Sequence, residues 1–178
     1  MFWCGLCVKD FVYMSWDDFE KRLFSTVVAF PSHTILIVGV PDQAGKAGMP
    51  FVQFGGIYAF GHNATMTAEL SLLNAGNQRV AFTDAQQAEF QELGFAPDED
   101  GFTWKQELPW PTPSHIIRNV VRACVTRLRD IGDVDSPERL VYKAWSYPDY
   151  RDEIPEEERS VGTDELDLPS LGLQREHT

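Results

Sequence analysis

A glycine-rich stretch is the first pattern in the sequence that could do chemistry. Gly39 to Lys46 (GVPDQAGK) resembles a phosphate-binding loop, but five residues separate its glycines where the motif has four. Ala47 follows the lysine, in place of the Ser or Thr that would hold magnesium. No helix is expected directly after the loop, so no helix N-terminus would be there to bind phosphate. The pattern therefore predicts a flexible hairpin loop.

The cysteines and histidines have the residue types, but not the spacing, of a metal or redox site. Cys4 and Cys7 form a Cys-x-x-Cys pair, yet zinc needs four ligands and there is no second pair. A redox pair is typical of a βαβ setting, which is not expected here. None of the four histidines has a partner at ligand spacing: they are His33, His62, His115 and His177. We therefore predict no catalytic residues, no metal and no cofactor, and do not expect an enzyme.

The charge balance weighs against nucleic acid as a partner. The chain has 178 residues with 27 acidic and 15 basic side chains, a formal net charge of −12. Binding to phosphates needs clustered Lys and Arg, which the sequence lacks. No apolar run approaches the roughly 18–20 residues that span a membrane, and three cysteines do not make a disulfide framework. We expect a cytoplasmic protein with no nucleic-acid and no membrane partner.

The first half of the chain predicts one helix followed by strands. Ser15 can cap a helix that ends at Pro31 and places apolar residues on one face, namely Phe19, Leu23, Val27 and Phe30. Three short strands should follow, with a loop over residues 41–50 after the first and Gly55-Gly56 as a hairpin turn between the last two. Their ranges are Thr34–Val40, Phe51–Phe54 and Ile57–Gly61. Residues 66–73 fit either a strand or a short helix.

The second half predicts another helix, a strand and a long helix. Thr83 and Gln86 form a capping box, and the helix that they start should stop at Gly94. Residues 102–108 alternate in polarity, which predicts a strand.

The long helix, expected from Pro113 to Ile131, has an unusually wide apolar surface. It carries two adjacent stripes, which are Ile117-Val121-Cys124-Leu128 and Ile116-Val120. One sheet face can cover only part of that width. The second stripe would then be covered either by a second copy of the chain or by the short element over residues 138–145.

Both ends of the chain differ in composition from the middle. Residues 1–13 precede the capped helix and look like an N-terminal extension, so the main domain is expected over 14–150. The segment 151–178 holds nine acidic and three basic residues and few large apolar ones. Such a segment buries too little apolar surface to offset its loss of conformational entropy. We expect an acidic, disordered tail.

Aromatic residues are the most promising class for binding. A sheet needs one covered face, so most aromatic side chains should face the helices. A single open antiparallel sheet with this aromatic density can still expose some of them, and such a patch marks a binding surface. Our candidate contact residues are Tyr58, Phe60 and Trp104.

The order and spacing of several short motifs resemble those of a known superfamily. These motifs are Trp16-x-x-Phe19, Phe51–Phe54, Leu93-Gly94-Phe95, Arg127–Val134 and Ser136-Pro137. Together they resemble the YbjN-like and type III secretion chaperone superfamily, above all its actinobacterial peptide-binding chaperones. The likeness covers about residues 14–147.

The resemblance implies an α+β fold in which a twisted antiparallel sheet is packed by about three helices. It also implies a bacterial protein, often a homodimer, that binds peptide segments of a client protein and has no catalytic residues. Two other functions stay open. One is an immunity or antitoxin-type protein that neutralises a basic partner through its acidic surface, and the other is an uncharacterised small enzyme.

Overall fold

The computed structural model describes residues 13–41, 47–60, 63–99, 101–148, 159 and 161–176, and only the backbone of 47–48, 57–60, 63 and 77. Within these ranges three α-helices occur: α1 (Trp16–Val28), α2 (Asp84–Glu92) and α3 (Ser114–Thr126). The π-helical turn η2 (Arg127–Ile131) continues α3, and 3-10 turns occupy η1 (Ala75–Asn77), η3 (Pro137–Arg139) and η5 (Pro169–Leu171).

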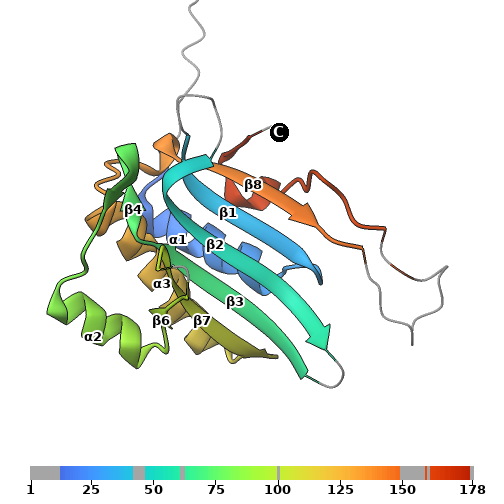
Figure 1. Ribbon diagram of the computed structural model, residues 1–178. Helices are drawn as coiled ribbons and strands as arrows, with labels where there is room; N and C mark the ends of the chain where they lie inside the picture. Colours follow the sequence, from blue (N-terminus) through green and yellow to red (C-terminus); the bar gives the residue numbers. More distant parts are fainter. Residues whose placement is uncertain are drawn as a thin grey trace, which may run out of the picture.

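The strands form one large sheet and a small hairpin (Figure 1). The large sheet has the order β6-β7-β3-β2-β1-β8-β9, and all of its pairs are antiparallel except β8 with β9. Its strands are β1 (Thr34–Pro41), β2 (Ala47–Phe60), β3 (Asn63–Ser71), β6 (Ala96–Pro97), β7 (Thr103–Trp110), β8 (Val141–Ser146) and β9 (Gln174–Arg175). The hairpin pairs β4 (Leu73–Asn74) with β5 (Gln78–Arg79). The predicted α+β class with a mostly antiparallel sheet is confirmed.

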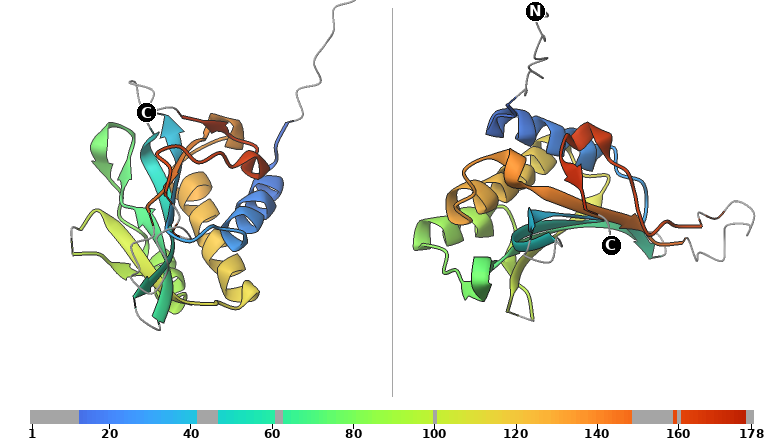
Figure 2. Two further views of the ribbon diagram at one scale, coloured as in Figure 1. Left: turned by 90° about the vertical axis from the view of Figure 1, so that its right-hand side faces the viewer. Right: turned by 90° about the horizontal axis from the view of Figure 1, so that it is seen from above.

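The helices α1 and α3 pack side by side on one face of the large sheet (Figure 2). The core lies between these two layers, because Leu36, Val38, Val52 and Phe54 all point toward the helices and are fully buried. Helix α2 lies near the end of the sheet formed by β6 and β7 (Figure 1). The opposite face of the central strands has no described helix over it (Figure 2).

The two caps expected from the sequence form. The Ser15 hydroxyl accepts a hydrogen bond from the Asp18 amide at 3.1 Å, which satisfies one free donor of α1. At α2, the Thr83 hydroxyl accepts from the Gln86 amide while the Gln86 side chain accepts from the Thr83 amide. Gly94 follows α2 with φ of +91°, the left-handed conformation that favours glycine after a helix.

The predicted hairpin turn at Gly55-Gly56 is wrong, because both glycines lie inside the long strand β2. They are needed there for close approach. A Cβ on Gly55 would lie 2.3 Å from the Thr67 hydroxyl oxygen, and one on Gly56 would lie 2.8 Å from the Thr34 carbonyl oxygen. Residues 47–50 of the predicted loop also belong to β2, while 42–46 lie outside the described residues. The ambiguous stretch 66–73 is strand β3 over most of its length.

Neither of the two predicted covers is needed for the second stripe of α3. Val120 is fully buried and Ile116 is partly buried against the core, because α1 packs along α3. Arg118 stacks on the Phe24 ring at 4.4 Å across this contact. The element over 138–145 does not cover the helix either; most of it is β8, an added strand beside β1. The homodimer thus loses this support and stays a prediction.

The prediction of a disordered tail is wrong for residues 161–176. Leu171 is fully buried, and β9 pairs with β8. Four leucines at 166, 168, 171 and 173 supply apolar surface that the acidic average of the whole segment conceals. Residues 149–158 and 160 lie outside the described residues, as do residues 1–12 at the other end, where the boundary at residue 14 stays a prediction.

Candidate functional site

The face of the large sheet opposite α1 and α3, here called the open face, is the candidate site. Side chains alternate between the two faces of a strand, so the neighbours of the buried residues point to the open face. Cross-strand partners share a face, and Ile37 lies opposite both Gln53 and Lys143. The described side chains of the open face include Ile35, Ile37, Phe51, Gln53, Thr67, Glu69, Lys105, Glu107, Val141, Lys143 and Trp145.

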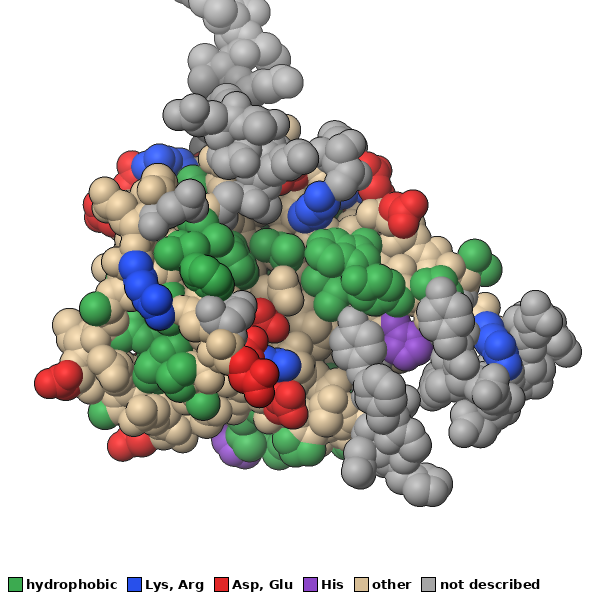
Figure 3. Space-filling model, in the orientation of Figure 1, with side chains coloured by type: hydrophobic (Ala, Val, Ile, Leu, Met, Phe, Trp, Pro, Cys, Tyr) green, Lys and Arg blue, Asp and Glu red, His purple; other side chains and the backbone are tan. Residues whose placement is uncertain are grey.

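Apolar side chains gather on one half of this face, over β1, β2 and β8 (Figure 3). Ile37, Phe51, Val141 and Trp145 are each partly exposed, and Ile35 lies directly beside Trp145. Gly39, which is buried, stands opposite both Phe51 and Val141. An extended segment could lie over the partly exposed side chains and bury its own apolar groups.

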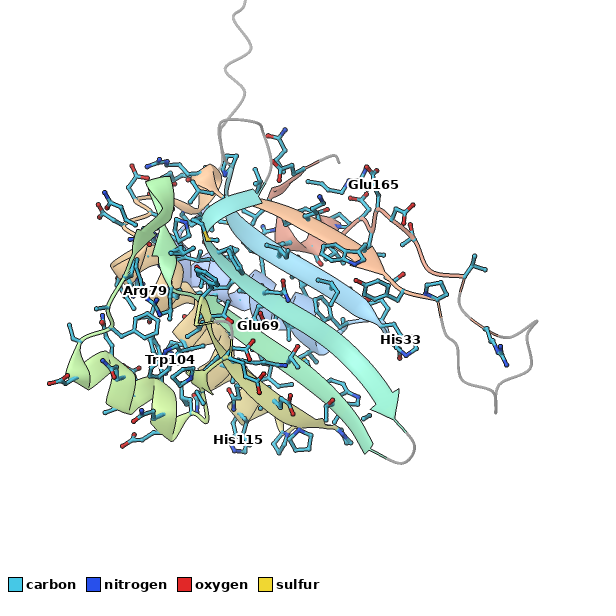
Figure 4. All side chains as sticks on the ribbon, viewed as in Figure 1. His33, Glu69, Arg79, Trp104, His115 and Glu165 are labelled. Carbon is cyan, nitrogen blue, oxygen red and sulfur yellow. The ribbon has the colours of Figure 1, made fainter. Side chains whose placement is uncertain are left out.

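The other half of the open face, over β3 and β7, is charged (Figure 3). Lys105 and Glu107 form an ion pair at 3.4 Å on β7. Glu69, on β3, lies opposite Lys105 on one side and Gln53 on the other (Figure 4). The open face thus offers apolar contact along β1, β2 and β8, and polar contact along β3 and β7.

The two edges of the sheet differ in their availability to another strand. At one edge, β6 pairs only with Trp104 and Lys105 of β7, and Pro109 further along lacks the N–H that pairing needs. At the other edge, residues 163–176 already occupy β8. A client segment could therefore reach the face more readily than either edge.

The structure places Trp104 away from the open face. Its side chain points to the helix-covered side, is 6% exposed, and packs edge-to-face against Phe82 with ring centroids 5.2 Å apart. It also lines a surface cavity of about 390 Å³ between the β4–β5 hairpin and α2, which Arg79 and Gln87 line as well (Figure 4). Tyr58 and Phe60 lie in β2 opposite Thr65 and Asn63, and their side chains lie outside the described residues.

Sequence reasoning missed the apolar residues of the open face. The run from Thr34 to Val40 is apolar on both faces of the strand, so its pattern does not reveal which side stays uncovered. Trp145 belongs to the element over residues 138–145, which is one of the two alternatives considered for covering α3, and only the pairing of β8 with β1 brings it to the open face.

The buried titratable groups in the described part of the chain do not converge on a reaction centre. Burial raises the pKa of the Cys124 thiol far above its ordinary value, and burial lowers the pKa of Arg127 to about 10. Among the described residues, no cluster of three or more His, Cys, Asp or Glu side chains could hold a metal ion. No described helix is long and apolar enough to cross a membrane.

The fold is consistent with a small chaperone-like α+β protein, and comparison with known proteins supplies the family. A family model described as TY-Chap3, the T3SS (YopN, CesT) and YbjN peptide-binding chaperone 3, matches residues 10–146. The chain therefore belongs to this family of peptide-binding chaperones, and the predicted resemblance is confirmed. No curated protein and no solved structure matches the chain.

Proposed function

We propose that this protein is a non-enzymatic, cytoplasmic chaperone or adaptor that binds an extended segment of a client protein across the open face of its sheet. The observation that supports this most is the row of partly exposed apolar side chains on β1, β2 and β8, which no described element covers. Membership of a peptide-binding family supports the same conclusion. Exposed contiguous apolar surface of this kind marks interaction sites in soluble proteins.

The side chains of the open face predict the sequence pattern of a client segment. Phe51 and Trp145 are rigid aromatic anchors that bury large areas at low entropic cost. Ile37 lies between Gln53 and Lys143, so polar groups flank the apolar contact and can bind the backbone of the client. We expect a segment whose apolar residues alternate with polar ones, as they do along a strand.

The proposal is tested by client capture with matched variants. The double variant Ile37→Ser and Phe51→Ser removes two apolar contacts from the open face without touching the helix-covered core. Each contact of this type contributes about 1 kcal/mol or more to binding, so we expect at least an approximately tenfold loss of captured client. The measurement is affinity capture from the native cytoplasm followed by quantitative mass spectrometry.

The control is Val28→Ser, which makes a similar change at a 41% exposed residue of α1 on the far side of the molecule. It should capture as much client as the unmodified chain. The proposal fails if the double variant and the control retain the same proteins, or if the unmodified chain enriches nothing above a mock capture.

A further inference from the structure

Residues 163–176, here called the strap, occupy the outer edge of β8 as a peptide ligand would. The amides of Ser146 and Thr163 each donate to the carbonyl of the other at 2.9 Å. The Leu166 amide donates to the Ala144 carbonyl and the Glu176 amide to the Tyr142 carbonyl, both at 2.8 Å. The strap thus satisfies backbone groups that a bare sheet edge would offer to another chain.

Side chains in the middle of the strap hold it against the rest of the domain. Leu171 is fully buried, and three further leucines pack against the core: Leu166, Leu168 and Leu173. The Tyr142 hydroxyl donates to the Asp167 carboxylate at 3.0 Å and accepts from the Leu168 amide at 2.9 Å.

On the α1 side, the strap also makes polar contacts. The hydroxyls of Thr26 and Ser170 are 3.2 Å apart, and Arg22 reaches the Ser170 carbonyl at 3.5 Å. Gly172 has φ of +71°, which lets the chain turn beside the Arg22 guanidinium. The strap is thus held by backbone pairing, by buried leucines and by one carboxylate bound by a tyrosine. Extended peptides are recognised through contacts of these kinds.

The strap also lies outside the part of the chain that matches the family. The family model ends at residue 146, the last residue of β8. The match therefore includes the sheet edge that the strap covers, but not the strap itself. The strap is connected to that edge through residues 147–162.

We propose that the surface formed by the β8 edge and the adjoining side of α1, here called the strap seat, is a peptide-binding site that the strap occupies in cis. The partner that fits it is an extended client segment with leucine-like side chains at the spacing of Leu166, Leu168, Leu171 and Leu173. Such a segment displaces the strap and takes over its hydrogen bonds to β8. The proposal rests on the proposed function only in that the partner is a peptide.

A tethered strap makes the strap seat selective. A segment joined by a short linker has an effective concentration of about millimolar at its own site. A client at lower concentration must therefore bind the strap seat more tightly than the strap does, or bind the open face at the same time. The apparent affinity of the client for the strap seat is its intrinsic affinity multiplied by the fraction of molecules whose strap seat is open.

The test uses the full-length chain and a fluorescently labelled peptide of residues 161–176, with binding followed by anisotropy. In the chain variant Leu171→Asp, a carboxylate replaces the buried side chain that anchors the strap, so the strap seat opens. We expect the labelled peptide to bind this variant at least about tenfold more tightly than the unmodified chain. The same peptide carrying Leu171→Asp should not bind either chain.

The matched control is the chain variant Val161→Asp, which makes the same kind of change at an 88% exposed residue just before the strap. It should bind the labelled peptide as weakly as the unmodified chain. A folded Leu171→Asp chain that binds no better than this control overturns the proposal. The result of this assay does not depend on whether the variant Ile37→Ser and Phe51→Ser loses captured client. Each of the two proposals can therefore fail without the other.

A second measurement uses the unmodified chain, so it does not require that any variant folds. Hydrogen exchange of the Thr163 and Leu166 amides should be at least about tenfold faster than that of Val38 and Val52 in the sheet centre, because the strap opens alone. Equal exchange rates would mean that the strap leaves only when the whole domain unfolds, and would overturn the proposal.

Discussion

Arg127 shows at the scale of one residue how the fold uses a buried charge. Arg127 is the first residue of η2, the turn that follows α3, and its side chain is fully buried. The Nε atom donates to the Ser71 carbonyl at 2.5 Å, and Nη2 donates to the Leu73 carbonyl and the Asn74 side chain, both at 2.9 Å. Burial lowers its pKa only to about 10, so the group stays charged at neutral pH.

Replacing Arg127 with Met should destabilise the protein by about 3 kcal/mol, because the carbonyls of Ser71 and Leu73 would stay buried without donors. Chemical denaturation followed by circular dichroism measures the loss. The control is Arg129→Met, two residues on, where an exposed side chain forms an ion pair with its neighbour Asp130. That change should cost less than about 0.5 kcal/mol, and similar losses for the two variants would contradict this role of Arg127.

At the scale of elements, α2 is the helix that depends most on its cap. Phe90 is its one fully buried residue among those described, and it packs against Phe82, Phe95 and Trp104. With so little buried surface, the reciprocal hydrogen bonds of Thr83 and Gln86 provide a large share of its stability.

The variant Thr83→Ala should therefore lower the free energy of unfolding by about 1 kcal/mol. Thermal and urea denaturation measure the change. Ser114→Ala, at the first turn of α3, is a suitable comparison, because the structure shows no side-chain cap at the start of that helix. An equal effect at both sites would mean that the capping box contributes little.

The sequence predicts those elements whose signals are local. The caps at Ser15 and Thr83 and the stripe of α1 depend on residues within a few positions of each other, so they could be identified directly. The glycines at 55 and 56 could not, because their role is set by Thr34 and Thr67 on neighbouring strands. The same holds for the open face and the strap, since both are defined by β8, which joins the sheet beside a strand about a hundred residues earlier.

At the scale of the whole molecule, the homodimer stays a prediction. The apolar stripes of α3 do not supply its interface, because they are covered within one chain. We expect light scattering at micromolar concentration to give about twice the chain mass of 20.2 kDa, with the open face left free for a client. A mass near 20.2 kDa that does not change on tenfold dilution would contradict the dimer.

The contact between Thr26 and Ser170 joins residues 144 positions apart, and this separation has a consequence for the order of events during translation. Residues 163–176 are synthesised after β8 and after α1. The strap can therefore close on its seat only when the residues that form the seat have already been made. Its contacts are among the last that the described part of the chain can form.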